Sequence, residues 1–93
     1  MVIGICTVEL FLPGTASLKD KRRILKSIKD RLRQRFNVSV AEIDEHDLWQ
    51  KTILGMACVG NEQQFVNRVL DQVMGLIGGT SQVEIVRSRL EFV

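Results

Sequence analysis

The sequence has few of the residue types on which catalysis in small proteins usually depends. It contains one histidine, no tyrosine and two cysteines. Cys6 and Cys58 lie inside apolar runs, which is typical of buried, reduced thiols and not of a disulfide framework. No cysteine or serine has a histidine placed to act as its base. We therefore expect a protein with no catalytic residues and no cofactor.

Long apolar runs and a leader-like segment are also missing. No stretch approaches the ~20 consecutive apolar residues of a membrane-spanning helix, and no basic segment precedes the apolar start of the chain. We expect a cytoplasmic protein with no membrane association. A length of 93 residues without a linker, repeat or low-complexity segment predicts one domain over residues 1–93.

What the sequence does contain is an orderly succession of strand and helix patterns. Apolar, β-branched runs predict strands, and apolar residues at steps of three and four predict helices. Pro13-Gly14 ends the first strand, and Ser17 with Asp20 fits a capping box that starts the first helix. Asn61 is the expected N-cap of the second helix, and Gly78-Gly79 its stop. The expected strands span residues 2–12, 38–45, 51–59 and 82–93, and the first helix ends near Asn37.

The order βαββαβ predicts a ferredoxin-like α+β fold, in which two helices cover one face of a four-stranded antiparallel sheet. The first and third strands are then central, and both are apolar on each side. A sheet with one wet face should instead alternate apolar and polar residues. We therefore expect a second copy to cover the open face, sheet to sheet or edge to edge, in a homodimer. The alternative is a monomer with scattered surface hydrophobic residues.

Charge is unevenly distributed, although the formal net charge is only +2. Residues 17–36 carry nine basic and two acidic side chains, whereas the rest of the chain carries four basic and nine acidic ones. A helix that needs only solubility usually mixes the two signs and gains i,i+4 pairs. Six basic residues form a stripe opposite the apolar face of the first helix. They are Lys19, Arg22, Arg23, Lys26, Lys29 and Arg33.

A basic stripe of this kind can follow the phosphates of RNA. Base stacking on the sheet is disfavoured, because the third strand carries no aromatic residue. Phosphate contacts would give weak sequence preference and a strong dependence on salt. A merely solvated helix face is the alternative, and so is pairing with an acidic edge of a second copy.

A second candidate cluster follows the second strand. Alternation places Glu42 and Asp44 on one side of that strand, with His46 at the turn, an arrangement that could hold a divalent metal ion. Turn formation and protection of an edge strand by charge explain the same residues, and we expect no metal. Trp49 is either a lid on the core or a contact residue, and we favour the lid.

Two motifs resemble the small bacterial YlxP-like family, whose members have unknown function. One is SLKDKRR at residues 17–23, and the other is VAEID at residues 40–44, followed by DLWQK at residues 47–51. The likeness spans nearly the whole chain and implies a cytoplasmic βαββαβ domain. The family's genes often lie near those for translation initiation and ribosome maturation, which implies a connection with RNA or the ribosome. The resemblance supplies no catalytic residue.

The sequence therefore predicts a non-enzymatic factor that associates with RNA or a ribosomal subunit through its first helix. The alternative is a small-ligand-binding or regulatory dimeric module. Its ligand would lie at the sheet interface of the dimer or in the loop Pro13–Ser17, which leads into a helix N-terminus.

Overall fold

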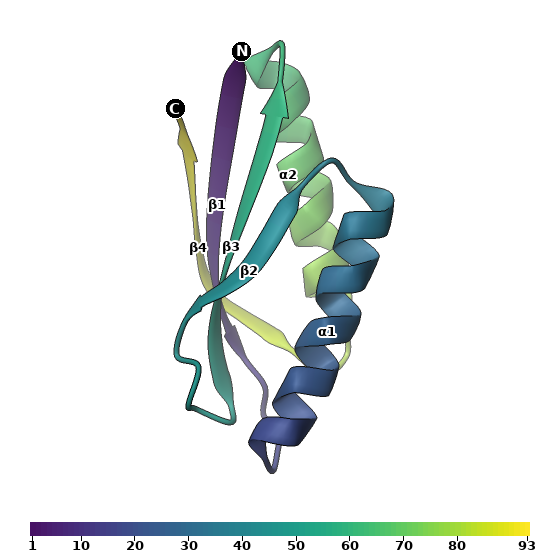
Figure 1. Ribbon diagram of the computed structural model, residues 1–93, viewed down its shortest axis with the longest axis vertical. Coiled ribbons are helices and arrows are strands. Elements are labelled where there is room, and N and C mark those ends of the chain that lie inside the picture. Colours follow the sequence, from purple (N-terminus) through teal and green to yellow (C-terminus); the bar gives the residue numbers. More distant parts are fainter.

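The computed structural model, which describes residues 1–93, has four strands and two helices in the predicted order βαββαβ (Figure 1). The sheet is antiparallel, with strand order β2-β3-β1-β4. Both helices lie on one face of this sheet, and no helix covers the other face (Figure 1). The ferredoxin-like α+β fold is confirmed. Its elements are β1 (Val2–Phe11), α1 (Leu18–Arg35), β2 (Ser39–Asp44), β3 (Lys51–Gly60), α2 (Gln63–Gly78) and β4 (Glu84–Phe92).

Helix α1 begins where the capping signal places it. The hydroxyl oxygen of Ser17 accepts a hydrogen bond from the backbone N–H of Asp20 at 3.1 Å, which satisfies one of the free amides in the first turn. The apolar face of the helix packs on the sheet through Ile24, Leu25, Ile28 and Leu32, all of which are buried.

Helix α2 begins one residue later than the sequence predicts. Its N-cap is Glu62, in extended conformation and without a side-chain capping bond, so the assignment of Asn61 as the cap is wrong. The predicted stop is confirmed, because Gly79 caps the C-terminus and its N–H bonds to the carbonyl of Gly75 at 3.0 Å.

Two glycines allow α2 to lie close to the central strands. A Cβ on Gly4 of β1 would come within 2.5 Å of Val66 and 2.8 Å of Leu70, and one on Gly60 of β3 within 2.9 Å of Val66. Glycine is the residue that permits such close approach of backbone to a packed side chain. The resulting core is a single cluster of 18 buried apolar residues between the sheet and the two helices.

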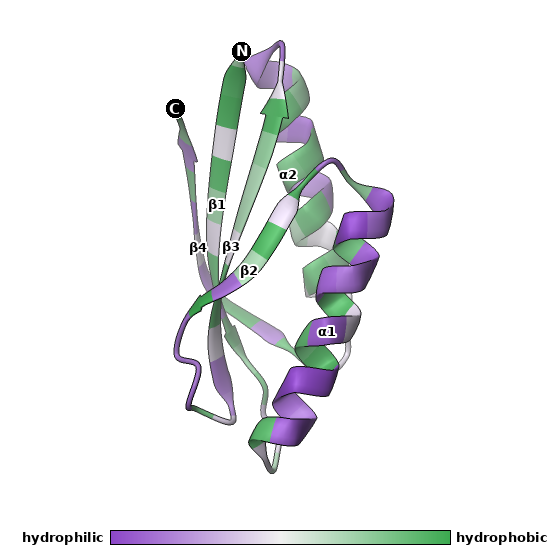
Figure 2. Cartoon of the chain, in the orientation of Figure 1, coloured by the Kyte–Doolittle hydropathy of each residue, from purple (hydrophilic) through white to green (hydrophobic).

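The two faces of the sheet differ in burial. Along β1 the even-numbered residues from Gly4 to Leu10 are buried, while the odd-numbered ones from Ile3 to Glu9 are only partly buried. The two ends of the chain meet at one corner, where the N–H of Val93 donates to the carbonyl of Ile3 at 2.8 Å. Figure 2 shows that apolar colour runs along β1 and β3, whereas much of α1 is hydrophilic.

Candidate nucleic-acid interface

The structure places the predicted basic stripe on the side of α1 that faces away from the sheet. Five of its six members, all but the partly buried Lys29, are exposed. The side chains of Lys19, Arg22, Arg23 and Lys29 make no ion pair or hydrogen bond. Four cations on this surface are therefore uncompensated within the chain.

The other two members of the stripe are engaged by Asp30, the only carboxylate within it. The ammonium group of Lys26 lies 2.8 Å from one oxygen of Asp30, and the guanidinium of Arg33 lies 3.9 Å from the other. Arg33 also donates to the backbone carbonyl of Val40 at 2.9 Å. The hydrogen bond from Lys26, together with the charges of Lys26, Arg33 and Lys29, lowers the pKa of Asp30. Three of the four unpaired cations of the stripe, Lys19, Arg22 and Arg23, therefore lie in the first two turns of α1.

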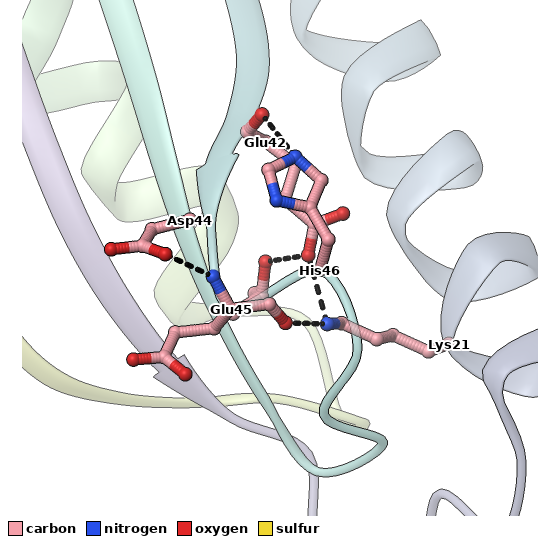
Figure 3. A network of polar contacts seen from close by, with 6 residues as sticks. Lys21, Glu42, Asp44, Glu45 and His46 are labelled. Atoms are coloured by element: carbon pink, nitrogen blue, oxygen red, sulfur yellow. Dashed lines mark hydrogen bonds and ion pairs between the residues drawn. The ribbon is translucent and has the colours of Figure 1, made fainter.

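Lys21 is a basic residue of α1 that does not belong to the surface, because its side chain is almost fully buried against β2 (Figure 3). Its ammonium nitrogen lies 2.8 Å from a carboxylate oxygen of Glu42 and donates to the backbone carbonyl of Glu45 at 2.6 Å. The hydroxyl of Thr52 donates to the same Glu42 oxygen at 2.6 Å. The contact joins α1 to β2, β3 and the loop between them.

The carboxyl group of Glu42 is held in its charged form by this contact. Burial on its own would raise the pKa of Glu42, but hydrogen bonds from Lys21 and Thr52, with the charges of Lys21 and His46, lower it overall. The carbonyl of Glu45 turns toward Lys21 because Glu45 adopts a left-handed conformation, with φ of 64°. This network is structural, since every charge in it already has a partner.

The prediction that Glu42 and Asp44 share one side of β2 is wrong. The pairing with β3 shifts by one residue between them, so that Ile43 is an extra, bulged residue. Glu42 points to Lys21 on α1, whereas the carboxylate of Asp44 lies on the other side of β2 (Figure 3). His46 contacts the backbone carbonyl of Glu42 at 3.1 Å and neither carboxylate. No group of three His, Cys, Asp or Glu side chains is arranged to hold a metal ion.

Trp49 does not form a lid on the core. It is 53% exposed and lines a shallow hollow at the end of the sheet with Phe11, Leu48 and Lys51. The alternative interpretation, that Trp49 is a contact residue, stays a prediction.

The loop before α1 borders a partly enclosed cavity of about 220 Å³. Thr15 of this loop is buried, and its hydroxyl is the one buried side-chain oxygen or nitrogen without a hydrogen-bond partner. The loop itself contains no arginine, but Arg23 lines the same cavity from the second turn of α1, beside Asp20. Arg23 lies six positions after Ser17, the last residue of the loop, so only the three-dimensional arrangement shows that it lines this cavity.

The two cysteines are buried, as the sequence predicts. Cys6 and Cys58 are free, buried thiols, and burial raises the pKa of each. Neither helix is long and apolar enough to cross a membrane.

These features define a small ferredoxin-like α+β domain with a cationic helix on its outer side. The chain belongs to the family described as "Protein of unknown function (DUF503)", whose model matches residues 3–90. It is 34% identical over 91 residues to the uncharacterized protein YlxP of Bacillus subtilis (strain 168), a match covering 98% of this chain and 99% of YlxP. The YlxP-like resemblance is thus confirmed.

A designed protein shares the fold without a close sequence relationship. The de novo designed protein Foldit4 superimposes with a TM-score of 0.51 at 12% identity, covering 100% of this chain and 94% of Foldit4. The likeness concerns the fold alone.

Proposed function

We propose that the protein is a non-enzymatic cytoplasmic factor that binds structured RNA, in or with a ribosomal subunit, through the outer face of α1. The observation that carries the proposal is the set of four basic side chains, Lys19, Arg22, Arg23 and Lys29, that have no partner within the chain. Unpaired cations on one rigid helix face can bind a row of phosphates without first breaking an ion pair within the chain.

The dimensions of the stripe support contact with several phosphates. From Lys19 to Arg33 the helix rises by about 21 Å at about 1.5 Å per residue. This length lets side chains on successive turns reach successive phosphates of one strand or both sides of a groove. Such contacts fix position and carry little sequence information.

The exposed aromatic residues are poorly placed for base stacking. Only Phe11 and Trp49 lie near each other at the surface, at one end of the sheet, and β3 carries no aromatic side chain. Recognition by stacking usually needs aromatic residues on the central strands. Phosphate contact by α1 is therefore the main mode that we propose.

A titration of labelled hairpin RNA by fluorescence anisotropy, from about 50 to 300 mM KCl, tests the proposal. Replacing Lys19, Arg22 and Arg23 by glutamine should weaken binding by more than about tenfold, and should reduce the slope of log K against log[salt] by roughly 2 to 3. The matched control replaces Arg31, Arg35 and Arg68 by glutamine, which removes the same charge from outside the stripe.

The control variant should keep most of the affinity. An equal loss in both variants would mean that net charge alone drives the binding, and an affinity insensitive to salt would contradict phosphate contact. Association with the ribosome is tested separately, by sedimentation of lysate through a sucrose gradient. Wild type should travel with a ribosomal subunit and the stripe variant should not.

The cavity beside Thr15 supports a second candidate function, the binding of a small polar ligand that regulates the protein. Its buried, unpartnered hydroxyl is a group that a ligand could satisfy, and an unsatisfied buried polar group costs about 1–3 kcal/mol. Arg23 supplies a positive charge at the same cavity, which suits a ligand with an anionic group.

Thermal unfolding with and without inorganic phosphate tests this second candidate, at ionic strength matched with KCl. A ligand that binds only the native state must raise the midpoint, and Thr15→Val should remove the increase. No increase with phosphate or with a panel of anionic metabolites contradicts it.

A further inference from the structure

The open face of the sheet is the largest feature that the proposed function leaves unexplained. Opposite residues of neighbouring antiparallel strands point to the same face, so the register places the odd-numbered residues of β1 and β3 together on it. The apolar members of this face include Ile43, 53% exposed, Val59, 45% exposed, and Phe11, 38% exposed. Ile3, Ile5 and Ile53 lie between them and are partly buried.

The size of this face suits a protein interface. Ten-residue strands extend about 33 Å, and four strands span about 19 Å. The footprint is of the same order as the roughly 800 Å² that each partner buries in a standard interface. The apolar side chains occupy only part of this footprint, because the residues of β4 on this face are charged. Exposed apolar side chains that are rimmed by charged ones are typical of protein interfaces.

Charged side chains on the two edges of the face indicate what covers it. Along one line across the sheet, Asp44 of β2 is opposite Ile53 of β3, Ile53 is opposite Glu9 of β1, and Glu9 is opposite Arg87 of β4. The face therefore has an acidic group at one edge and a basic group at the other, at the same level along the strands.

Neither of these edge groups is fully satisfied within the chain. The side chain of Arg87 is 80% exposed and lies 3.4 Å from Glu9, which also pairs with Lys51. Asp44 is exposed and accepts only the N–H of Glu45, at 2.8 Å. Asp44 has no ion pair.

We propose that a second copy of the chain packs face to face on this sheet, related by a two-fold axis parallel to the strands, with Arg87 of each copy on Asp44 of the other. Such an axis places β4 of one copy over β2 of the other, and keeps each residue at its own level. Apolar side chains of β1 and β3 then meet at the centre of the interface, and an ion pair between Arg87 and Asp44 lies at each of its two edges. An axis across the strands would instead stack β4 on β4 and bring the two Arg89 residues together.

The bulge in β2 is what makes this arrangement feasible. It directs Asp44 to the open face while Glu42 stays with Lys21 on the helix side. Both α1 helices lie on the outside of the dimer, so the dimer interface and the basic stripe are separate surfaces.

Light scattering coupled to size-exclusion chromatography at about 100 µM tests the dimer. Wild type should have twice the chain mass of 10.6 kDa. Ile53→Lys, at the centre of the face, should have the mass of one chain and still unfold cooperatively. Phe65→Lys, a similar change at an exposed position on α2, should remain dimeric. A wild type of single-chain mass would overturn the proposal.

Charge exchange tests the direction of the axis. Arg87→Glu and Asp44→Arg should each weaken the dimer, and the double variant should restore it toward wild type. Restoration of Arg87→Glu by Glu91→Arg instead would place the axis across the strands and overturn this arrangement. RNA titrations with Ile53→Lys separate the two proposals. A monomer with an intact basic stripe should still make the same number of phosphate contacts per chain, and so keep the salt dependence of a single stripe.

Discussion

Lys21 shows how one residue on a basic helix can have a role opposite to that of its neighbours. It lies three residues before Ile24 and seven before Ile28, so helical spacing alone places it on the buried side of α1. The sequence therefore contained the signal, but the identity of its partner did not follow from it. Glu42 is 21 positions away and reaches Lys21 only because β2 lies beside α1.

The pKa of Glu42 leads to a prediction about stability and pH. Its folded-state pKa is lowered, so the stability it contributes is complete above the ordinary glutamate pKa of about 4.3. That stability is lost as the pH falls through the lower, folded-state value. Glu42→Gln should lower the free energy of unfolding by about 2 kcal/mol at pH 7. The difference from wild type should shrink as the pH falls below about 4.3.

Urea unfolding at pH 7, 5 and 3 measures this difference. Glu84→Gln is the control, because Glu84 is exposed and has no ion pair, and it should change stability little at any pH. A deficit in Glu42→Gln that stays constant from pH 7 to pH 3 would show that the charge of Glu42 does not stabilise the fold.

At the scale of elements, the distance between α2 and the sheet depends on glycine in the strands and not on glycine in the helix. Gly4 faces Val66 and Leu70 with no room for a methyl group, while nothing lies within 4 Å of a Cβ built on Gly75. The same substitution at these two positions should therefore have opposite effects.

Gly4→Ala should lower the free energy of unfolding by about 1–3 kcal/mol, because α2 must move away from β1. Gly75→Ala should raise it by about 0.5–1 kcal/mol, because alanine favours the helix and meets no neighbour. Denaturant titrations of both variants measure the two shifts. Stabilisation by Gly4→Ala would contradict the close packing of α2 on β1.

The bulge in β2 marks the limit of what alternation in a sequence can predict. The number, order and type of the elements followed from local patterns, and most boundaries agree to within two residues. The extra residue Ile43 did not, because its cause lies in the neighbouring strand. Its side chain covers Gly55 of β3, where a Cβ would lie 3.1 Å from it, while Lys21 holds Glu42 on the opposite side.

At the scale of the whole molecule, the fold separates two surfaces. The outer side of α1 and the open face of the sheet lie on opposite sides of the core (Figure 1). Charge segregation along the sequence was sufficient to locate the first, and apolar strands were sufficient to indicate the second. The pairing of Asp30 with Lys26 follows from their spacing of four residues in a helix. The pairing of Arg87 with Glu9 did not follow from the sequence, since it depends on β4 lying beside β1.

In the proposed dimer, this separation gives a bivalent particle. Two stacked sheets lie about 10 Å apart and each helix layer adds about 10 Å. The two basic stripes would therefore face outward in opposite directions, about 30 Å or more apart. Such a dimer could join two RNA segments, and linked binding of this kind increases affinity without any new contact.

The pairing of β1 with β4 also affects how the chain must fold. Gly4 pairs with Phe92, and the backbone bonds between Ile3 and Val93 close the same corner. The central strand β1 therefore gains one of its two neighbours only from a segment 73 to 88 residues further on. Contacts so distant in sequence slow folding. Because β4 follows both helices in the chain, we expect the edge of β1 that pairs with β4 to stay unpaired until β4 is synthesised, although both helices can already form.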